Sequence, residues 1–251
     1  MGATGQQGVL GYFDIELMIV LLAGQFAELA DRYSKGVLAF ALGSGAFIGF
    51  GVGLLPHQLS DTQSAFTVFL AGSLMLGKFS SVLVAVFLLL RLAFIGQMEL
   101  ASGLGKIQTI SSSNPPGNFG SRVSQAVEDF GQPAAHVFAC VWTVFIAWCL
   151  YLFACLSAYR IGLEVMTPLS SESLFNDLLA GMSIFDLWRS LLRTLVVAYA
   201  LGWLADAQSF IGGHLSHESS HTSTIRYMLL GGVVILVLEL MDTFLFFKAP
   251  L

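Results

Sequence analysis

The stretch "VFACVWTVFIAWCLYLFACLSAY", residues 137–159, contains no Asp, Glu, Lys or Arg. About 20 apolar residues allow a helix to cross the hydrocarbon core of a bilayer, which is roughly 30 Å thick. The uncharged run 130–159 therefore predicts a transmembrane helix. The composition of the chain points the same way, because 56% of its 251 residues are hydrophobic and 11% are charged. Soluble domains carry about 25% charged residues, so we expect an integral membrane protein.

Four other apolar regions flank this helix, at 36–55, 62–97, 187–204 and 225–247. Together they predict an all-α integral membrane protein with about five transmembrane helices. Region 62–97 is too long for one upright crossing. We expect one long, tilted or broken helix there, or a span plus a re-entrant piece. If the region instead forms two full spans, the total is six. The acidic stretch 162–183 is expected to be a loop.

The N-terminal residues 1–35 mix a short apolar run with several charged side chains. That run is too short to cross, so we expect an amphipathic helix lying in the membrane interface. Arg32, Lys35, Lys106 and Arg122 favour a cytoplasmic N-terminus under the positive-inside rule. The polar connection 102–133 contains "SSSNPPGN" and is then a cytoplasmic loop.

Two function classes are disfavoured by the residue pattern. The net charge is −5, and the basic residues are scattered, so nucleic acid is not an expected partner. The segment "GSLMLGK", residues 72–78, fits Gly-x-x-x-x-Gly-Lys, but Phe79 replaces the required Ser or Thr. It also lies within an apolar region. With no nucleophile and base at a recognisable spacing, we expect a chain that is not an enzyme and has no nucleotide site of its own.

Small residues recur at every fourth position of the first span: Ala41, Gly45, Gly49 and Gly53. This spacing places them on one helix face, where another helix can approach closely. Three interpretations remain open: packing within the chain, a subunit interface, or the lining of a substrate cavity.

Charged residues within apolar regions are costly and tend to face protein or water. Lys78 and Glu239 have apolar residues on both sides, so they are the better functional candidates. Arg91, Glu99 and Asp242 also fit a structural role or a place at the membrane interface.

Three of the five histidines, His214, His217 and His221, fall within the segment "GGHLSHESSHTSTIR". On a helix their offsets of three and four would place them on one face, able to ligate a divalent metal. The glycines and hydroxyl residues around them indicate a flexible polar loop instead, so no metal is expected there.

Several segments in chain order carry a family resemblance: "SGAFIGFGVGL" at 44–54, Arg91 with Glu99 eight residues later, "QAVEDFGQPAAHVF" at 125–138, "GGHLSHESSHTSTIR" at 212–226, and "LVLELMDTFLFF" at 236–247. Together they resemble the permease subunit of MlaE/YrbE type, the membrane partner in ABC systems that move phospholipids with MCE-domain proteins. The resemblance covers about 36–247. It implies that the histidines decorate a loop between the last two spans.

The resemblance implies one permease domain over 1–251, made of the interfacial helix 1–35 and a transmembrane region 36–251. It also implies a second permease copy or paralogue, an ABC ATPase that carries ATP and Mg²⁺, an MCE-domain protein and bound phospholipid. The expected location is the bacterial inner membrane or an organelle equivalent. The alternatives are a metal or ion transporter using the histidines, and a membrane scaffold that does not transport.

Two sets of site residues follow. The ATPase is expected to contact a coupling segment within the loop 102–133, made of Gln125, Ala126, Val127, Glu128, Asp129, Phe130, Gly131 and Pro133. The substrate path is expected to include Gly45, Gly49, Gly53, Lys78 and Glu239. Lys78 is the candidate for contact with a phosphate headgroup, as a point charge.

Overall fold

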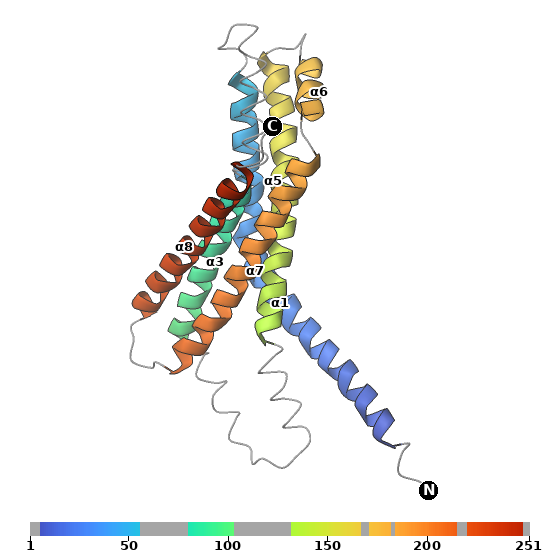
Figure 1. Cartoon of the computed structure of the whole chain (residues 1–251), viewed down its shortest axis with the longest axis vertical. Coiled ribbons are helices and arrows are strands. Elements are labelled where there is room, and N and C mark those ends of the chain that lie inside the picture. Colours follow the sequence, from blue (N-terminus) through green and yellow to red (C-terminus); the bar gives the residue numbers. More distant parts are fainter. Residues whose placement is uncertain are drawn as a thin grey trace.

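The computed structural model of the chain describes residues 6–55, 80–102, 132–166, 171–181, 184–214 and 220–247. Every element in these ranges is helical, and none is a strand. The helices in Figure 1 are α1 (Gln6–Leu54), α3 (Ser80–Ser102), α5 (Gln132–Met166), α6 (Ser171–Gly181), α7 (Ile184–His214) and α8 (Ser220–Phe247). The predicted all-α class is confirmed for this part of the chain.

Three of the described helices are long and apolar enough to cross a membrane: Leu22–Leu54 in α1, Ala134–Val165 in α5 and Thr224–Met241 in α8. The segment Ser80–Ile95 of α3 is apolar but shorter. The described chain is therefore compatible with an integral membrane protein. The predicted span 187–204 lies in α7, whose first residues include Asp186, Arg189 and Arg193. The count of about five spans stays a prediction.

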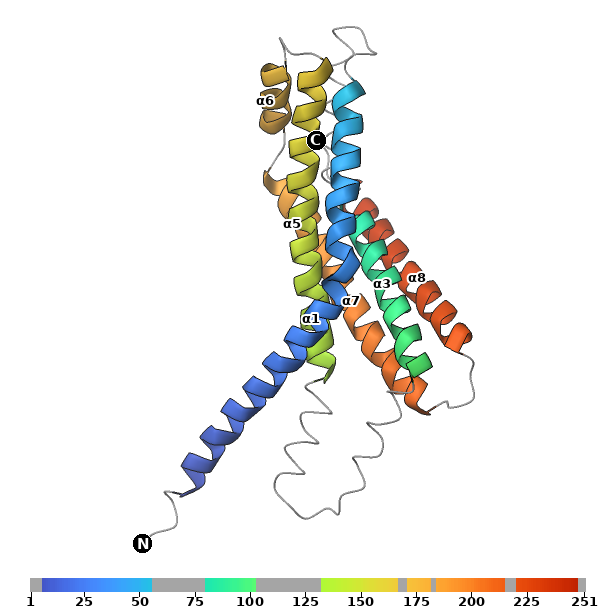
Figure 2. The ribbon, with the colours of Figure 1, turned by 180° about the vertical axis from the view of Figure 1, so that it is seen from behind.

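Helix α1 is broken near its middle. Lys35 has ψ 113° and Gly36 has φ 92°, both outside the helical range. A positive φ is readily adopted by glycine, which commonly ends a helix in this way. We call this break the elbow. The segment before it leaves the bundle at an angle, while the segment after it runs beside α5 (Figure 2). The elbow falls at the predicted boundary between residues 1–35 and the first span.

Helix α5 packs against α1 on one side and α7 on another, while α3 lies against α7 and α8. Figure 1 shows α3 and α8 side by side, with α7 between them and α5. The largest fully buried side chains come from several helices and include Tyr151, Leu88, Leu163 and Leu201. One continuous apolar core therefore joins α3, α5, α7 and α8 to the second part of α1.

The stretch 162–183, expected to be a loop, contains the end of α5 and the helix α6. Leu174 and Leu178 lie four residues apart, and Leu178 is buried while Asp177 is exposed. This apolar spacing is typical of an amphipathic helix. Phe175 packs against Tyr159 of α5, with ring centroids 6.3 Å apart. The loop prediction was wrong here because the acidic residues occupy only the outer face of a short helix.

Candidate functional site

Polar side chains from four helices meet where α3 begins. We call this group the polar cluster. Its members are Ser80 and Ser81 of α3, Trp148 of α5, Ser190, Arg193 and Thr194 of α7, and Glu239 of α8.

The centre of the polar cluster is an ion pair between Arg193 and Glu239. Nη2 of Arg193 lies 3.0 Å from Oε1 of Glu239, and the two side chains are 9% and 26% exposed. The guanidinium also donates to Ser81, from Nε at 3.1 Å and from Nη2. A buried charge is tolerated when it is paired and hydrogen-bonded. Arg193 thus joins α3, α7 and α8 through one side chain.

A second set of hydrogen bonds surrounds Ser190. Its hydroxyl oxygen accepts from Nε1 of Trp148 at 3.3 Å and lies 3.2 Å from the hydroxyl oxygen of Ser80. Thr194 donates to the Ser190 carbonyl at 2.6 Å. Ser80, Ser190 and Thr194 are buried. These contacts tie α5 to α3 and to α7, the helix that carries Arg193.

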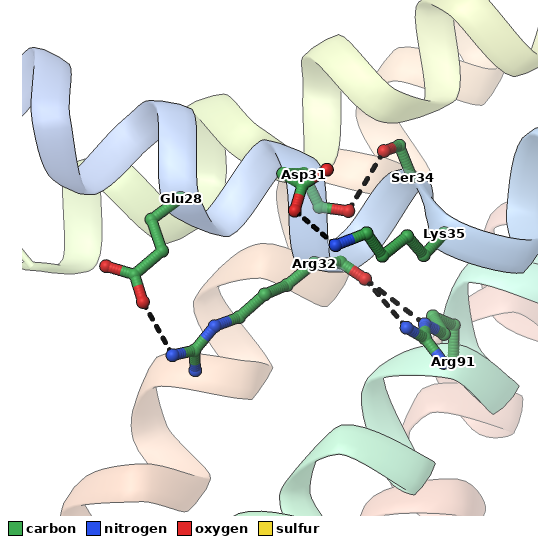
Figure 3. Close-up of polar contacts among 6 residues, drawn as sticks. All are labelled: Glu28, Asp31, Arg32, Ser34, Lys35 and Arg91. Atoms are coloured by element: carbon green, nitrogen blue, oxygen red, sulfur yellow. Dashed lines mark hydrogen bonds and ion pairs between the residues drawn. The ribbon is translucent and has the colours of Figure 1, made fainter.

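The elbow forms a separate polar region at another level of α3 (Figure 3). Arg91 donates to the carbonyl oxygen of Arg32 from Nε at 3.2 Å and from Nη2 at 3.0 Å. Carbonyl groups at a helix end lack partners within the helix, and Arg32 lies in the last turn before Gly36. Arg91 therefore caps this turn and attaches the N-terminal segment of α1 to the bundle.

Two ion pairs lie in the turns of α1 just before the elbow. Arg32 lies 2.6 Å from Glu28, and Lys35 lies 2.5 Å from Asp31. All four side chains are well exposed, so each pair contributes little alone. Together they concentrate charge at the elbow.

The glycines proposed for the substrate path lie in the contact between α1 and α5. A Cβ atom added to Gly45 would lie 2.5 Å from the carbonyl oxygen of Tyr151, and one added to Gly53 would lie 2.6 Å from that of Tyr159. At Gly49 the clash, with the carbonyl oxygen of Cys155, is the most severe of the three. We call this contact the glycine seam. Of the three interpretations left open, packing within the chain describes this position.

The glycine seam also shows how the second part of α1 and α5 are oriented relative to each other. Each glycine faces the residue that follows it by the same offset of 106 positions, so the second part of α1 and α5 run parallel. Gly162 completes the contact from the α5 side, where an added Cβ would lie 2.9 Å from the carbonyl oxygen of Phe50. The two backbones therefore approach each other closely from Gly45 to Gly53 of α1.

Other predicted residues lie where the structure describes no side chain. Lys78 and 125–131 of the coupling segment are outside the described residues, and Pro133 lies in the first turn of α5. Glu99 and Asp242 lie in α3 and α8 without described side chains.

The three histidines also lie partly outside the described residues. The backbone of His214 ends α7 and that of His221 lies near the start of α8, while His217 lies outside the described residues. Within the ranges where side chains are described, no three His, Cys, Asp or Glu residues are grouped as metal ligands.

Sequence reasoning found Glu239 but missed its partner. Arg193 lies within the predicted span 187–204 but was not named as a candidate, although a basic residue in one apolar helix and an acidic residue in another signal a buried ion pair. The residues Ser80, Ser81 and Ser190 carry no such signal, because serine is common both in loops and in helix contacts.

A scan against protein-family models finds no match to this chain, and a search of the curated proteins finds no match either.

Proposed function

We propose that this chain is the permease subunit of a transporter that moves phospholipids or related lipids between membranes, powered by a separate ABC ATPase. The observation that carries the proposal is the polar cluster, in which an ion-paired arginine lies among apolar helices. Ionisable residues within a membrane mark substrate pathways by default. The motif resemblance at 44–54 and 236–247 supports the same function.

The depth of the polar cluster supports a role in transport. Arg91 lies at the elbow, where charges gather, and Ser81 precedes it by ten residues on α3. At about 1.5 Å per residue this separation is about 15 Å, half of the roughly 30 Å hydrocarbon core. If the elbow lies at the membrane interface, the pair Arg193–Glu239 lies within the hydrocarbon core. We propose about five crossing segments, in α1 after the elbow, 62–97, α5, α7 and α8, and an interfacial helix before the elbow.

The ion pair suggests how a lipid headgroup is handled. A guanidinium binds phosphate with two parallel hydrogen bonds, so a phosphate group can replace Glu239 as the partner of Arg193. Glu239 is the more exposed member of the pair and is better placed to turn away. Acyl chains would be accommodated by apolar helix surfaces, each buried methylene contributing about 0.8 kcal/mol. Lys78, two residues before Ser80, is proposed as a second phosphate contact.

Coupling to ATP hydrolysis is proposed through the start of α5. Residues 125–133 precede or begin this helix, and α5 carries Trp148, which donates to Ser190. A subunit that pushes on 125–133 therefore moves a helix that contacts α7 directly. The remaining partners of the proposal are a second permease copy or paralogue and an MCE-domain protein. The proposed location is the bacterial inner membrane or an organelle equivalent, with a cytoplasmic N-terminus.

The proposal is tested by gentle purification of the chain with its native partners, followed by reconstitution of the assembly into vesicles. We expect a nucleotide-hydrolysing subunit to copurify and ATP-dependent transfer of a fluorescent phospholipid to follow. Arg193→Gln is expected to lower this transfer at least tenfold. The matched control is Arg160→Gln, which breaks an exposed pair with Glu164 in α5 and should leave transfer unchanged. An assembly without an ATPase and without lipid transfer would favour the scaffold alternative and contradict the proposal.

A further inference from the structure

A cavity of about 360 Å³ lies beside the elbow, between α1 and α5. Asp31, Ser34 and Leu38 line it from α1, and Trp142, Thr143 and Ile146 line it from α5. Its volume falls within the range of about 300–1,000 Å³ typical of small-molecule sites. Figure 3 shows Asp31 and Ser34 on the turns of α1 that approach the elbow. The polar cluster shares no residue with this cavity, which we call the elbow cavity.

Thr143 gives the elbow cavity an unused hydrogen-bonding group. Its side chain is 1% exposed, and its hydroxyl oxygen has no hydrogen-bond partner. A buried polar atom without a partner costs about 1–3 kcal/mol. The other buried threonine of the bundle centre, Thr194, satisfies its hydroxyl through the carbonyl of Ser190. A ligand that accepts a hydrogen bond from Thr143 would remove this cost.

The residues that line the elbow cavity change from polar to apolar along the direction of α1 and α5. Asp31 and Ser34 lie before the elbow, on the charged side, whereas Leu38 and Ile146 lie farther along the apolar helices. Trp142 lies between them with half of its surface exposed, as is common for tryptophan at a membrane interface. The occupant should therefore be amphiphilic, with its polar group near Asp31 and its chains beside Leu38 and Ile146.

The charge of the residues that line the elbow cavity indicates which polar group the bound molecule carries. Asp31 is the single charged residue among those that line the elbow cavity. One of its carboxylate oxygens accepts from Lys35 at 2.5 Å, and a carboxylate retains further acceptor sites. A donor of positive charge therefore fits best. Lys35, which pairs with Asp31, supplies a positive charge that would attract a phosphate group beside that donor.

We propose that the elbow cavity binds one membrane phospholipid whose headgroup carries a primary amine. The ammonium group donates to Asp31, and Thr143 donates to a phosphate or ester oxygen of the same molecule. The lipid fills the space between the N-terminal segment of α1 and α5, and so supports the angle that Gly36 introduces. This site depends on membrane insertion of α1 and α5 but not on transport.

The test is native mass spectrometry of the purified chain, with any copurifying partners, after exchange into three synthetic lipids with identical acyl chains. Phosphatidylethanolamine supplies the primary amine, phosphatidylcholine has a positive charge without an N–H donor, and phosphatidylglycerol has neither. We expect one phosphatidylethanolamine per chain to survive collisional activation that removes the other two lipids. Equal retention of the three lipids would overturn the proposal.

Three variants locate the binding. Thr143→Val keeps the volume and removes the hydroxyl, so retention should fall about fivefold, as expected for one lost hydrogen bond. Asp31→Asn should abolish the preference for the primary amine. Ile146→Trp should fill the cavity and displace the lipid, even where Thr143→Val has a small effect. Thr224→Val, at a buried threonine of α8 away from the elbow, is the matched control and should retain the lipid.

Retention that is unchanged in both Thr143→Val and Ile146→Trp would place the lipid elsewhere and contradict the proposal. A chain that binds this lipid at the elbow but transfers no lipid would contradict the proposed function and leave the elbow site standing.

Discussion

The glycine seam and the polar cluster join helices by opposite means. In the seam, α1 and α5 touch backbone to backbone, and Gly49 leaves no room for any side chain against Cys155. In the polar cluster, α3, α7 and α8 are joined through Arg193, Ser81 and Glu239. Contacts fixed by shape have one good arrangement, whereas hydrogen bonds and ion pairs can exchange partners. We therefore expect the contact between α1 and α5 to be rigid and the contacts among α3, α7 and α8 to be adjustable.

The largest expected effect comes from breaking the seam. Gly49→Leu would drive a side chain into the backbone of α5, so we expect a loss of stability above about 5 kcal/mol, in the exceptional range for one substitution. The yield of folded protein in size-exclusion chromatography measures it. Gly51→Leu is the matched control, because an added Cβ at Gly51 meets nothing within 4 Å. Folded Gly49→Leu protein with normal activity would contradict the close approach of the two helices.

The second effect comes from the polar cluster. Glu239→Leu removes the carboxylate that pairs with Arg193, and we expect a loss of about 3 kcal/mol, at the low end for a buried pair because Glu239 is partly exposed. Adding Arg193→Met should restore part of this stability. Chemical unfolding of both single variants and the double variant in detergent gives the coupling energy.

The control for this cycle is the exposed pair Arg160 and Glu164, at 3.1 Å in α5. Its coupling energy should be below about 1 kcal/mol. Equal coupling energies in the two pairs would show that water screens Arg193 and Glu239 as strongly as it screens the exposed pair. That result would contradict a stabilising role for the buried ion pair.

The third effect concerns the elbow, which separates the seam from the N-terminal segment. Gly36 has φ 92°, so Gly36→Ala should cost about 1–2 kcal/mol or straighten α1. Gly24→Ala, within a regular helical turn where an added Cβ meets nothing, should instead stabilise α1 slightly. Distances between spin labels placed before and after the elbow measure the change. Identical distances and stabilities in the two variants would remove the special role of Gly36.

The smallest effect tests the connection between α5 and α7. Trp148→Phe removes the hydrogen bond from Nε1 to Ser190, so we expect a loss of about 1 kcal/mol. Trp142→Phe is the matched control on the same helix, since Trp142 is largely exposed, and its loss should stay within about 0.5 kcal/mol. Equal losses would indicate that Trp148 contributes through packing alone.

The seam and the polar cluster also differ in how far the sequence predicted them. Four-residue spacing of small residues predicted a close helix contact, but its partner could not be named. The α5 side contributes the carbonyl oxygens of Tyr151, Cys155 and Tyr159 to the contact, and Gly162 follows at its end, so the α5 side lacks the regular four-residue spacing of small residues. A backbone surface leaves no residue-type signal, so only the tertiary structure identifies it.

For the polar cluster, the apolar residues on both sides of Glu239 marked it as a candidate. The pairing with Arg193 depends on the relative height of α7 and α8. That height is set by core packing around residues such as Leu201 and Tyr227, whose hydroxyl donates to the Leu201 carbonyl. Such packing cannot be read from either helix alone.

The most direct test of the account is a density map of the intact assembly in lipid nanodiscs, at a resolution that shows side chains. The account predicts a lipid phosphate within hydrogen-bonding distance of Arg193, acyl chains between the helices, and a nucleotide-hydrolysing subunit in contact with residues 125–133. A map in which Arg193 and Glu239 stay paired, no acyl chain enters the bundle, and residues 125–133 contact no such subunit would contradict it.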